Sequence, residues 1–422
     1  MMSRMTQLAL GSVLAGAAAL SSAQDVRAAQ TLPAPVKTHW ATSWIAPPEP
    51  TWGPDFTLPV GMPEQLENIT LRQNLRVSVG GKRIRLVIDN AYSDRPLKIG
   101  RAHVAVEAGR AGAFATFGGD REVVVAAGAQ AVSDPIALAT PPASRLQVDL
   151  YLPERSRLAG FHWDAHDRSL LLPGNAAGRA EAKAGQELAT RAFLSAVLVE
   201  SAREPVTVVA LGDSLTDGNG STPGSDHRWP DFLARRLQSR GVAVLNAGIS
   251  GNRLLRPGMG DSALARLDRD VLRMPGVRAV VVLLGTNDIG WPGGPFAPSE
   301  TLPPLEDFTQ GFRQLVAQAH LRGVRVIGGT IAPFEDALEG TPQEGHYSPQ
   351  KDARRQAVND WIRHSGVFDA VVDFDRLLRD PSRPIRLRAE FDCGDHLHPN
   401  DAGYRAMAEA IDLDALLGDT AL

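Results

Sequence analysis

From Pro205 onward, short apolar runs alternate along the chain with segments of helical spacing. The apolar runs are continuous, as expected of strands buried on both faces, and cover residues 206–211, 242–245, 279–284, 324–327 and 370–374. Helical spacing occupies residues 228–240, 308–322, 351–365 and 402–417. Alternation of this kind predicts a parallel sheet with helices on both faces, that is, a three-layer α/β/α domain.

The first half of the chain has a different periodicity. Residues 40–198 contain short runs in which apolar and polar residues alternate, separated by turns that contain Gly and Pro. Residues 77–79 and 84–88 flank Gly80-Gly81, a pattern that predicts a β-hairpin. An all-β, sandwich-like domain is therefore expected ahead of the α/β domain. With the boundary at 200–205, the predicted domains are 30–204 and 205–422.

Residues 1–29 have the features of a secretory signal peptide. Arg4 precedes a short apolar stretch at 8–20, and small residues suited to cleavage follow, ending at Ala23 or Ala28. The stretch is shorter than the roughly 20 apolar residues that span a bilayer. We therefore expect a secreted or periplasmic protein with no stable membrane insertion.

Charge and cysteine content exclude several other classes. The formal net charge is −4 with the two signs interspersed, so no basic surface for nucleic acid is expected. Cys393 is the only cysteine, so no intrachain disulfide can form. It lies two residues before Asp395, but no basic neighbour in the sequence would activate its thiolate, and we interpret it as a loop residue.

Polar segments follow several of the predicted strands, where functional residues collect in open α/β sheets. These segments are Gly212-Asp213-Ser214-Leu215, Asn246 to Asn252, Gly285-Thr286-Asn287-Asp288 and, before the last helix, Asp395-His396-Leu397-His398-Pro399. Singly, Ser214 could be a helix N-cap and Asn287 part of an Asx turn. Their joint occurrence at the strand ends of one sheet indicates a site.

The residue types in these segments suit nucleophilic catalysis. A serine hydroxyl needs a neighbouring base, and His398 is the candidate base for Ser214. Asp395, three residues before His398, can hold the imidazole in the required tautomer and orientation. His396 competes as base, but only His398 stands in Asp-x-x-His spacing; His396 could pair with Asp392 or face solvent.

In order and spacing, these segments resemble the sequence blocks of the SGNH (GDSL) hydrolase family over residues 206–410. The resemblance implies a flavodoxin-like sheet, cleavage of carboxylic esters, and no metal or organic cofactor. It also implies an oxyanion hole formed by the N–H groups of Ser214 and Gly251 and the amide of Asn287. Gly248 competes with Gly251 for this role, although the spacing favours Gly251 and leaves Gly248 as a turn glycine. Asp213 and Asp288 are interpreted as loop-fixing residues.

Residues 71–90 and 161–175 resemble, more weakly, the β-rich extension of some secreted bacterial members of the family. His162, Asp164 and His166 could form a metal site, but no further ligand is placed by spacing, which favours a hydrogen-bonded loop. The tryptophans of this half could form a sugar-stacking face or belong to the core: Trp40, Trp44, Trp52 and Trp163.

Together with the family resemblance, which implies ester cleavage, these patterns predict a secreted serine ester hydrolase that forms an acyl-enzyme. Family analogy favours short acyl groups, such as O-acetyl groups on a glycan, so the expected partner is a small-molecule or carbohydrate ester. Two alternatives remain open. One is a lipase or lysophospholipase for longer chains, against which the lack of a conspicuous amphipathic lid weighs. The other is a glycan-binding protein on a hydrolase scaffold that has lost its activity.

Overall fold

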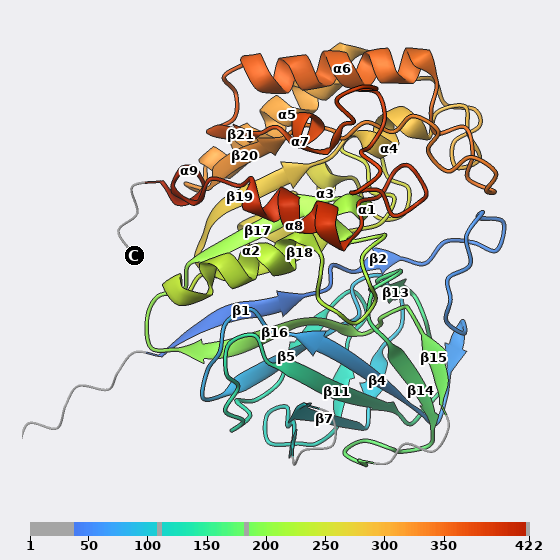
Figure 1. The fold of residues 1–422 in the computed structure, drawn as a ribbon. Coiled ribbons are helices and arrows are strands. Elements are labelled where there is room, and N and C mark those ends of the chain that lie inside the picture. Colours follow the sequence, from blue (N-terminus) through green and yellow to red (C-terminus); the bar gives the residue numbers. More distant parts are fainter. Residues whose placement is uncertain (1–37, 108–111, 181–184, 419–422) are drawn as a thin grey trace, which may run out of the picture. The chain divides into compact units, whose positions relative to one another are not determined.

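The computed structural model describes residues 38–107, 112–180 and 185–418 (Figure 1). The predicted signal peptide, residues 1–29, lies outside these ranges. None of the helices within them combines the length and the apolar character needed to cross a bilayer. Thr38–Leu422 form one compact unit, which contains both the β-rich half and the α/β half.

The β-rich half contains two main antiparallel sheets. The four-stranded sheet has the order β1 (His39–Ile45), β16 (Leu194–Ser201), β5 (Ile84–Asp89), β10 (Gln130–Val132). The six-stranded sheet has the order β15 (Gln186–Leu188), β14 (Ser169–Pro173), β4 (Ile69–Arg76), β11 (Arg145–Leu152), β7 (Arg101–Val106), β8 (Ala113–Phe114). Short pairs complete the half: β2 (Glu49–Pro50) with β13 (Gly160–Phe161), β3 (Gln65–Leu66) with β12 (Ser156–Arg157), and β6 (Leu97–Ile99) with β9 (Val123–Val125).

The two main sheets share one apolar core, which confirms the sandwich-like domain. Leu71 and Leu75 of β4 are buried together with Leu86 and Ile88 of β5, although these strands belong to different sheets. Alternate residues of each strand face inward, as the period-two pattern predicts. Packing between two such faces is what stabilises a sandwich.

The hairpin expected around Gly80-Gly81 is wrong. β4 pairs with β11 and β14, whereas β5 pairs with β16 and β10, so the segment between them passes from one sheet to the other. A Cβ on Gly80 would lie 2.4 Å from the carbonyl oxygen of Thr140, and one on Gly81 would lie 2.5 Å from that of Glu200. The glycines therefore permit close approach of other backbone segments rather than a two-residue turn.

The C-terminal half contains one five-stranded parallel sheet of order β18 (Ala243–Gly248), β17 (Thr207–Gly212), β19 (Val277–Leu283), β20 (Arg325–Gly329), β21 (Ala370–Val372). This is the flavodoxin-like order 2-1-3-4-5. The α-helices are α1 (Ser214–Asp217), α2 (Trp229–Leu237), α3 (Ala263–Leu267), α4 (Thr286–Gly290), α5 (Leu305–His320), α6 (Pro349–His364), α7 (Phe374–Leu378), α8 (Asp401–Glu409) and α9 (Leu413–Leu417). A 3-10 turn follows α2 at Gln238–Arg240, and a π-turn follows α3 at Asp268–Leu272.

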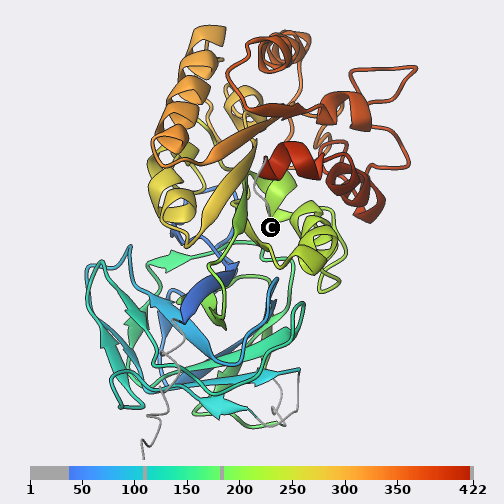
Figure 2. The ribbon, with the colours of Figure 1, turned by 90° about the vertical axis from the view of Figure 1, so that its left-hand side faces the viewer.

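Helices cover both faces of the parallel sheet, as predicted (Figure 2). Val209 and Leu211 of β17 share a core with α5 and α6, whereas Val208 and Ala210 share the opposite core with α2 and α8. The single helix expected at 402–417 is two helices instead. The side chain of Asp412 accepts hydrogen bonds from the first amides of α9, which makes it the N-cap of a new helix.

Arg266 in α3 joins the carboxyl ends of two neighbouring strands, β17 and β18. Its guanidinium is fully buried and donates to the carbonyl oxygens of Gly212 at 3.0 Å and Ala247 at 2.8 Å. It also donates to Oδ1 of Asn252 at 2.9 Å and pairs with the Asp270 carboxylate at 3.1 Å. One side chain therefore holds the ends of β17 and β18 and the loop that follows β18.

Replacing this arginine should destabilise the fold strongly. In Arg266→Met the buried Asp270 carboxylate and the strand carbonyls lose their partner, which should cost about 3–5 kcal/mol of unfolding free energy. Arg322→Met is the matched control, because Arg322 is exposed and lies 3.7 Å from Asp268, so it should cost under about 1 kcal/mol. Denaturant unfolding of both variants would measure the two costs, and equal costs would contradict this role for Arg266.

Candidate active site

The four polar segments meet at the carboxyl edge of the parallel sheet. Ser214 begins α1 directly after β17, and Asn287 lies in α4 after β19. Gly251 lies in the loop after β18, and His398 lies in the loop before α8. These residues line one cleft. Parallel strands bring their carboxyl ends to the same edge, so residues far apart in the chain converge there.

An unbroken hydrogen-bonded chain joins the three predicted catalytic side chains. Nε2 of His398 lies 2.8 Å from Oγ of Ser214, and Nδ1 of His398 lies 2.6 Å from Oδ2 of Asp395. The other oxygen of Asp395 accepts from the backbone N–H groups of Leu397 and His398, which fixes the carboxylate. This is the arrangement in which a histidine can take the proton of a serine hydroxyl.

The electrostatics keep Asp395 ionised. Burial alone would raise its pKa, but the hydrogen bond and charge of His398 and the two backbone donors outweigh burial and hold the pKa well below its ordinary value. An ionised Asp395 stabilises the imidazolium that forms when His398 takes a proton. His396 pairs instead with Asp392, its Nδ1 lying 2.5 Å from Oδ2, and the histidine whose Nε2 lies beside Oγ of Ser214 is His398.

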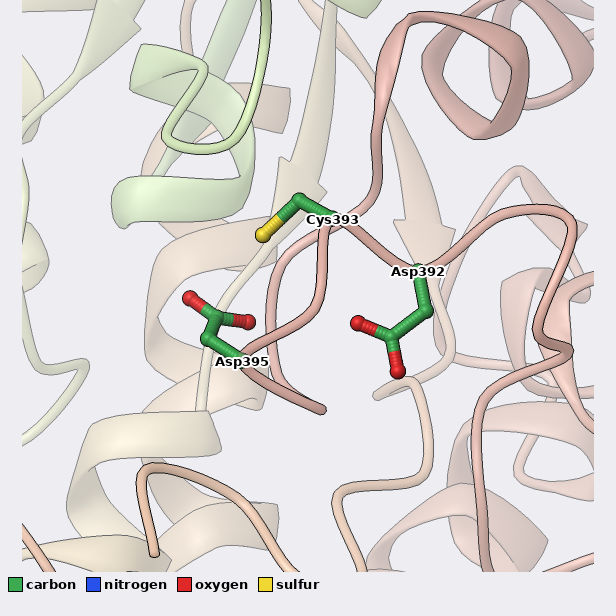
Figure 3. Close-up of side chains that lie close together, drawn as sticks. All are labelled: Asp392, Cys393 and Asp395. Carbon is green, nitrogen blue, oxygen red and sulfur yellow. The ribbon is translucent and has the colours of Figure 1, made fainter. Parts of the chain in front are cut away.

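Asp392, Cys393 and Asp395 lie close together on this loop (Figure 3). The two carboxylates already accept hydrogen bonds from His396 and His398. Partial burial and the adjacent Asp395 carboxylate raise the pKa of the Cys393 thiol to about 12. The thiol is therefore protonated at neutral pH, in keeping with a loop residue, and the side chains of this group serve the geometry of the loop.

The three residues predicted to supply oxyanion donors, Ser214, Gly251 and Asn287, all line the cleft. Within residues 38–107, 112–180 and 185–418, no protein acceptor is found for the backbone N–H groups of Ser214 and Gly251. The side-chain amide of Asn287 donates one hydrogen to the carbonyl oxygen of Asn252 at 3.0 Å, which orients the amide and leaves its second hydrogen. Converging donors of this kind can stabilise an oxyanion.

The two glycines considered for the oxyanion hole, Gly248 and Gly251, have different surroundings in the structure. Gly251 lines the cleft and has φ of +72°, a conformation that favours glycine. Gly248 instead ends β18; its N–H donates to Oδ1 of Asn246, and a Cβ there would lie 2.2 Å from the backbone nitrogen of Asp217. Gly248 therefore permits close packing of α1 on β18, whereas Gly251 lines the same cleft as Ser214.

Comparison with protein families agrees with this geometry. Residues 210–406 match the model of the GDSL-like Lipase/Acylhydrolase family. The C-terminal half is a GDSL-like acylhydrolase domain. The family is one of carboxylic ester hydrolases, and the protein is accordingly an enzyme of this class. None of the curated proteins compared with the chain matches it.

Solved structures resemble the chain over about half its length. A GDSL-like lipase from Bacteroides thetaiotaomicron is 21% identical, with a TM-score of 0.37 over 50% of this chain and 91% of its own. An acetyl xylan esterase is 19% identical, with a TM-score of 0.35 over 49% and 97%. An esterase from Pseudoalteromonas is 20% identical, with a TM-score of 0.35 over 48% and 93%.

Two loop carboxylates of the GDSL domain, Asp213 and Asp288, accept hydrogen bonds from backbone N–H groups. Asp288 accepts from the backbone N–H groups of Leu254 and Leu255 at 2.8 and 3.0 Å, which holds the loop that carries Gly251. Asp213 caps α1 by accepting from Leu215 N–H at 3.0 Å. These contacts are those of loop-fixing residues.

A buried network connects the GDSL domain to the β-rich half. Nε2 of His162 lies 3.2 Å from Oδ1 of Asp217, and its Nδ1 lies 3.0 Å from the carbonyl oxygen of Pro47. Oδ2 of Asp217 accepts from the backbone N–H of Ser250 at 3.2 Å and lies 2.8 Å from its hydroxyl. Ser250 precedes Gly251, so this network supports the loop that carries the predicted oxyanion donor.

The charges within this network are mutually stabilising. Burial alone would lower the pKa of His162, but the charge and hydrogen bond of Asp217 outweigh it and raise the pKa. A cationic His162 can donate from both ring nitrogens, as its two contacts require. His166 Nε2 lies 2.6 Å from Oδ1 of Asn219. Both histidines that were considered as metal ligands therefore contact residues outside their own loop.

Sequence reasoning missed several residues of the cleft. Leu58, Met259, Trp291, Phe296 and His346 line it together with the predicted residues. None of them belongs to a motif, and their apolar or isolated character gave no signal that they would converge. Trp163 also lines the cleft, whereas Trp40 and Trp44 lie beneath the guanidinium groups of Arg85 and Arg191, at 4.7 and 5.3 Å from their ring centroids. The four tryptophans therefore do not form one sugar-stacking face.

The buried carboxyl beside the nucleophile predicts a pH-dependent effect on stability. Burial, with a smaller contribution from Asp288, raises the pKa of Asp213 to about 7, compared with about 3.9 in an unfolded chain. Between these values the folded protein binds a proton that the unfolded chain does not, so stability falls as pH rises. Asp213→Asn removes this dependence and keeps a capping side chain.

We therefore expect the difference in thermal unfolding midpoint, Asp213→Asn minus the unsubstituted protein, to increase from pH 5 to pH 8. Asp134→Asn serves as the control: hydrogen bonds from Thr116 and from backbone donors lower the pKa of Asp134, so it is ionised in both states over this range. The midpoint difference between Asp134→Asn and the unsubstituted protein should not change with pH. A midpoint difference for Asp213→Asn that stays constant or decreases as the pH rises would contradict the raised pKa.

Proposed function

We propose that this protein hydrolyses short-acyl carboxylic esters with Ser214 as nucleophile, through an acyl-enzyme. The observation that carries the proposal is the chain from Asp395 through His398 to Ser214, with hydrogen bonds of 2.6 and 2.8 Å. Ser214 and His398 line one cleft with Gly251 and Asn287. Nucleophile, base, orienting carboxylate and oxyanion donors are then present together, as acyl transfer requires.

The reaction follows from these positions. Oγ of Ser214 attacks the ester carbonyl carbon while Nε2 of His398 takes the hydroxyl proton, and Asp395 stabilises the imidazolium. The N–H groups of Ser214 and Gly251 and the amide of Asn287 bind the developing oxyanion. His398 then gives its proton to the leaving alcohol as the C–O bond breaks. Water, activated by the same imidazole, adds to the acyl-enzyme and releases the acid.

The size and lining of the cleft support a small acyl group and a polar alcohol. Its volume is about 60 Å³, far below the roughly 300–1,000 Å³ of sites that enclose drug-sized ligands. A short acyl group fits such a space, and the rest of the substrate remains outside. Polar side chains that can bind hydroxyl groups also line it, among them Asn219, Ser250 and Gln343. We therefore propose O-acetyl groups on a glycan as the first natural substrate to test.

We also propose that the enzyme is exported and acts in the periplasm or outside the cell. The basis is the pattern of residues 1–29, in which Arg4 precedes the apolar stretch 8–20. Activity measured in separated cytoplasmic, periplasmic and medium fractions tests this proposal. Recovery of the unprocessed chain in the cytoplasm alone would contradict it.

Hydrolysis of 4-nitrophenyl acetate, butyrate and octanoate by the purified protein tests the ester hydrolase mechanism. Ser214→Ala should lower kcat by about 10⁴-fold or more, because nucleophile and base act as a unit. Asn287→Ala should lower kcat by about 100-fold, the usual cost of one oxyanion donor. Ser221→Ala is the control, because Ser221 is also buried but its hydroxyl donates to Gly218, and it should retain activity.

Full activity in Ser214→Ala would overturn the serine mechanism. A profile that favours octanoate would replace the short-acyl proposal with a lipase. If the protein cleaves none of the nitrophenyl esters and no acetylated glycan, the ester hydrolase proposal fails, and a binding role for the scaffold takes its place.

A further inference from the structure

The β-rich half contributes part of the wall of the catalytic cleft. Leu58 and Trp163, both from this half, line the cleft that contains Ser214. Met259, Trp291 and Phe296 of the GDSL domain line the same cleft and belong to one apolar cluster with them. We call these five residues the apolar wall.

Hydrogen bonds hold the β-rich part of the apolar wall in place. The backbone N–H of Trp163 donates to Oε1 of the buried Glu49 at 2.7 Å, and its indole N–H donates to the carbonyl oxygen of Pro59 at 3.0 Å. The indole N–H of Trp52 donates to the carbonyl oxygen of Leu58 at 2.7 Å. Both indole donors are thus engaged by the segment that carries Leu58, so the wall is a fixed surface rather than a loose loop.

Ring contacts continue the wall from one half of the protein to the other. Phe56, next to this segment, has its ring centroid 4.9 Å from that of Trp52 and 5.6 Å from that of Phe296. Phe296 in turn stacks on Trp291 at 4.7 Å. Aromatic pairs at these separations contribute beyond their buried area, so the positions of the β-rich residues are coupled to those of the GDSL residues.

The apolar wall lies beside the predicted oxyanion glycine. A Cβ on Gly251 would lie 2.5 Å from Sδ of Met259 and 2.8 Å from a ring carbon of Trp291. In contrast, the backbone N–H of Leu338 donates to the carbonyl oxygen of Asp395 at 2.9 Å, and Leu338, Gln343 and His346 line the cleft. The segment that carries Gln343 and His346 therefore lies toward the loop of the base, whereas the wall lies toward the oxyanion glycine.

The chemistry of the reaction assigns a substrate group to each side. The leaving oxygen must lie next to Nε2 of His398, because it receives the proton from that atom. The alcohol therefore extends along the side of the cleft near His346 and Gln343, which carries polar groups. The acyl chain, on the other side of the carbonyl carbon, is directed away from the base and toward the apolar wall.

We propose that Trp163, supported by Leu58, closes the acyl subsite and makes the enzyme selective for short acyl groups. This inference rests on the proposed ester hydrolase function and gives the β-rich half a direct part in specificity. The indole of Trp163 occupies the space that the fourth and later carbons of a longer acyl chain would need. Its removal should open the subsite without touching the groups that carry out the chemistry.

The experiment measures kcat/KM for 4-nitrophenyl acetate, butyrate and octanoate in Trp163→Ala, Trp163→Phe and Leu58→Ala. We expect the octanoate-to-acetate ratio to rise at least about tenfold in Trp163→Ala, since even one methylene in an apolar pocket changes kcat/KM by about 10-fold or more. Trp163→Phe should show a smaller rise, because phenylalanine fills more of the space than alanine. Leu58→Ala, at a partly exposed position, should raise the ratio even if Trp163→Ala does not fold.

Trp40→Ala is the matched control. Trp40 belongs to the same half, in β1, and lies against Arg85 rather than in the cleft. Its replacement should leave the ratio unchanged. A general loss of stability would lower kcat/KM for all three esters alike in every variant and would not alter the ratio.

The outcomes separate this inference from the proposed function. If the unsubstituted protein hydrolysed none of the esters, the proposed ester hydrolase function would itself be contradicted. Hydrolysis with an unchanged octanoate-to-acetate ratio in Trp163→Ala and Leu58→Ala would overturn the inference and leave the function intact.

Acetate esters of methanol, phenol and nitrophenol form a second series of substrates. A change in alcohol preference without a change in acyl preference would show that the wall borders the alcohol, which also overturns the inference.

Discussion

The position of the catalytic groups depends on one buried arginine. Arg266 donates to the carbonyl oxygens of Gly212 and Ala247, the residues where β17 and β18 approach their carboxyl ends, and to the side chain of Asn252. Ser214 follows the first of these strands and Gly251 the second. The carbonyl oxygen of Asn252 in turn accepts from the amide of Asn287. Five fixed N–H donors on a planar group suit this task, which a lysine could not perform.

The β-rich half is tied to the same edge of the sheet by buried charge. His162 pairs with Asp217 in α1, and Asp217 accepts from Ser250, next to Gly251. Burying such a pair has a cost in desolvation that only good geometry offsets. In return, the loops that present nucleophile and oxyanion donors are held from both sides. His162 is followed in the chain by Trp163, so this network and the apolar wall share one segment of the β-rich half.

Much of the fold could be predicted from periodicity, because strands buried on both faces and amphipathic helices have distinct patterns. The glycine pair at 80–81 shows the limit of such patterns. A two-residue turn and a close approach of distant backbone both call for glycine, and only the partners, Thr140 and Glu200, distinguish them. The break at Asp412 in the last helix was missed for a similar reason, since aspartate is tolerated within helices as well as at their caps.

The sequence by itself identified the candidate catalytic groups of the site. The spacing of Asp395 and His398 and the placement of Ser214 after a buried strand were enough to indicate a nucleophile, its base and an orienting carboxylate, because these relations are local in the chain. Tertiary structure alone decided which glycine faces the cleft and that Trp163 joins it from the other half. Such contacts depend on where distant segments pack, because the identity of an apolar residue does not indicate which residues it will contact in the fold.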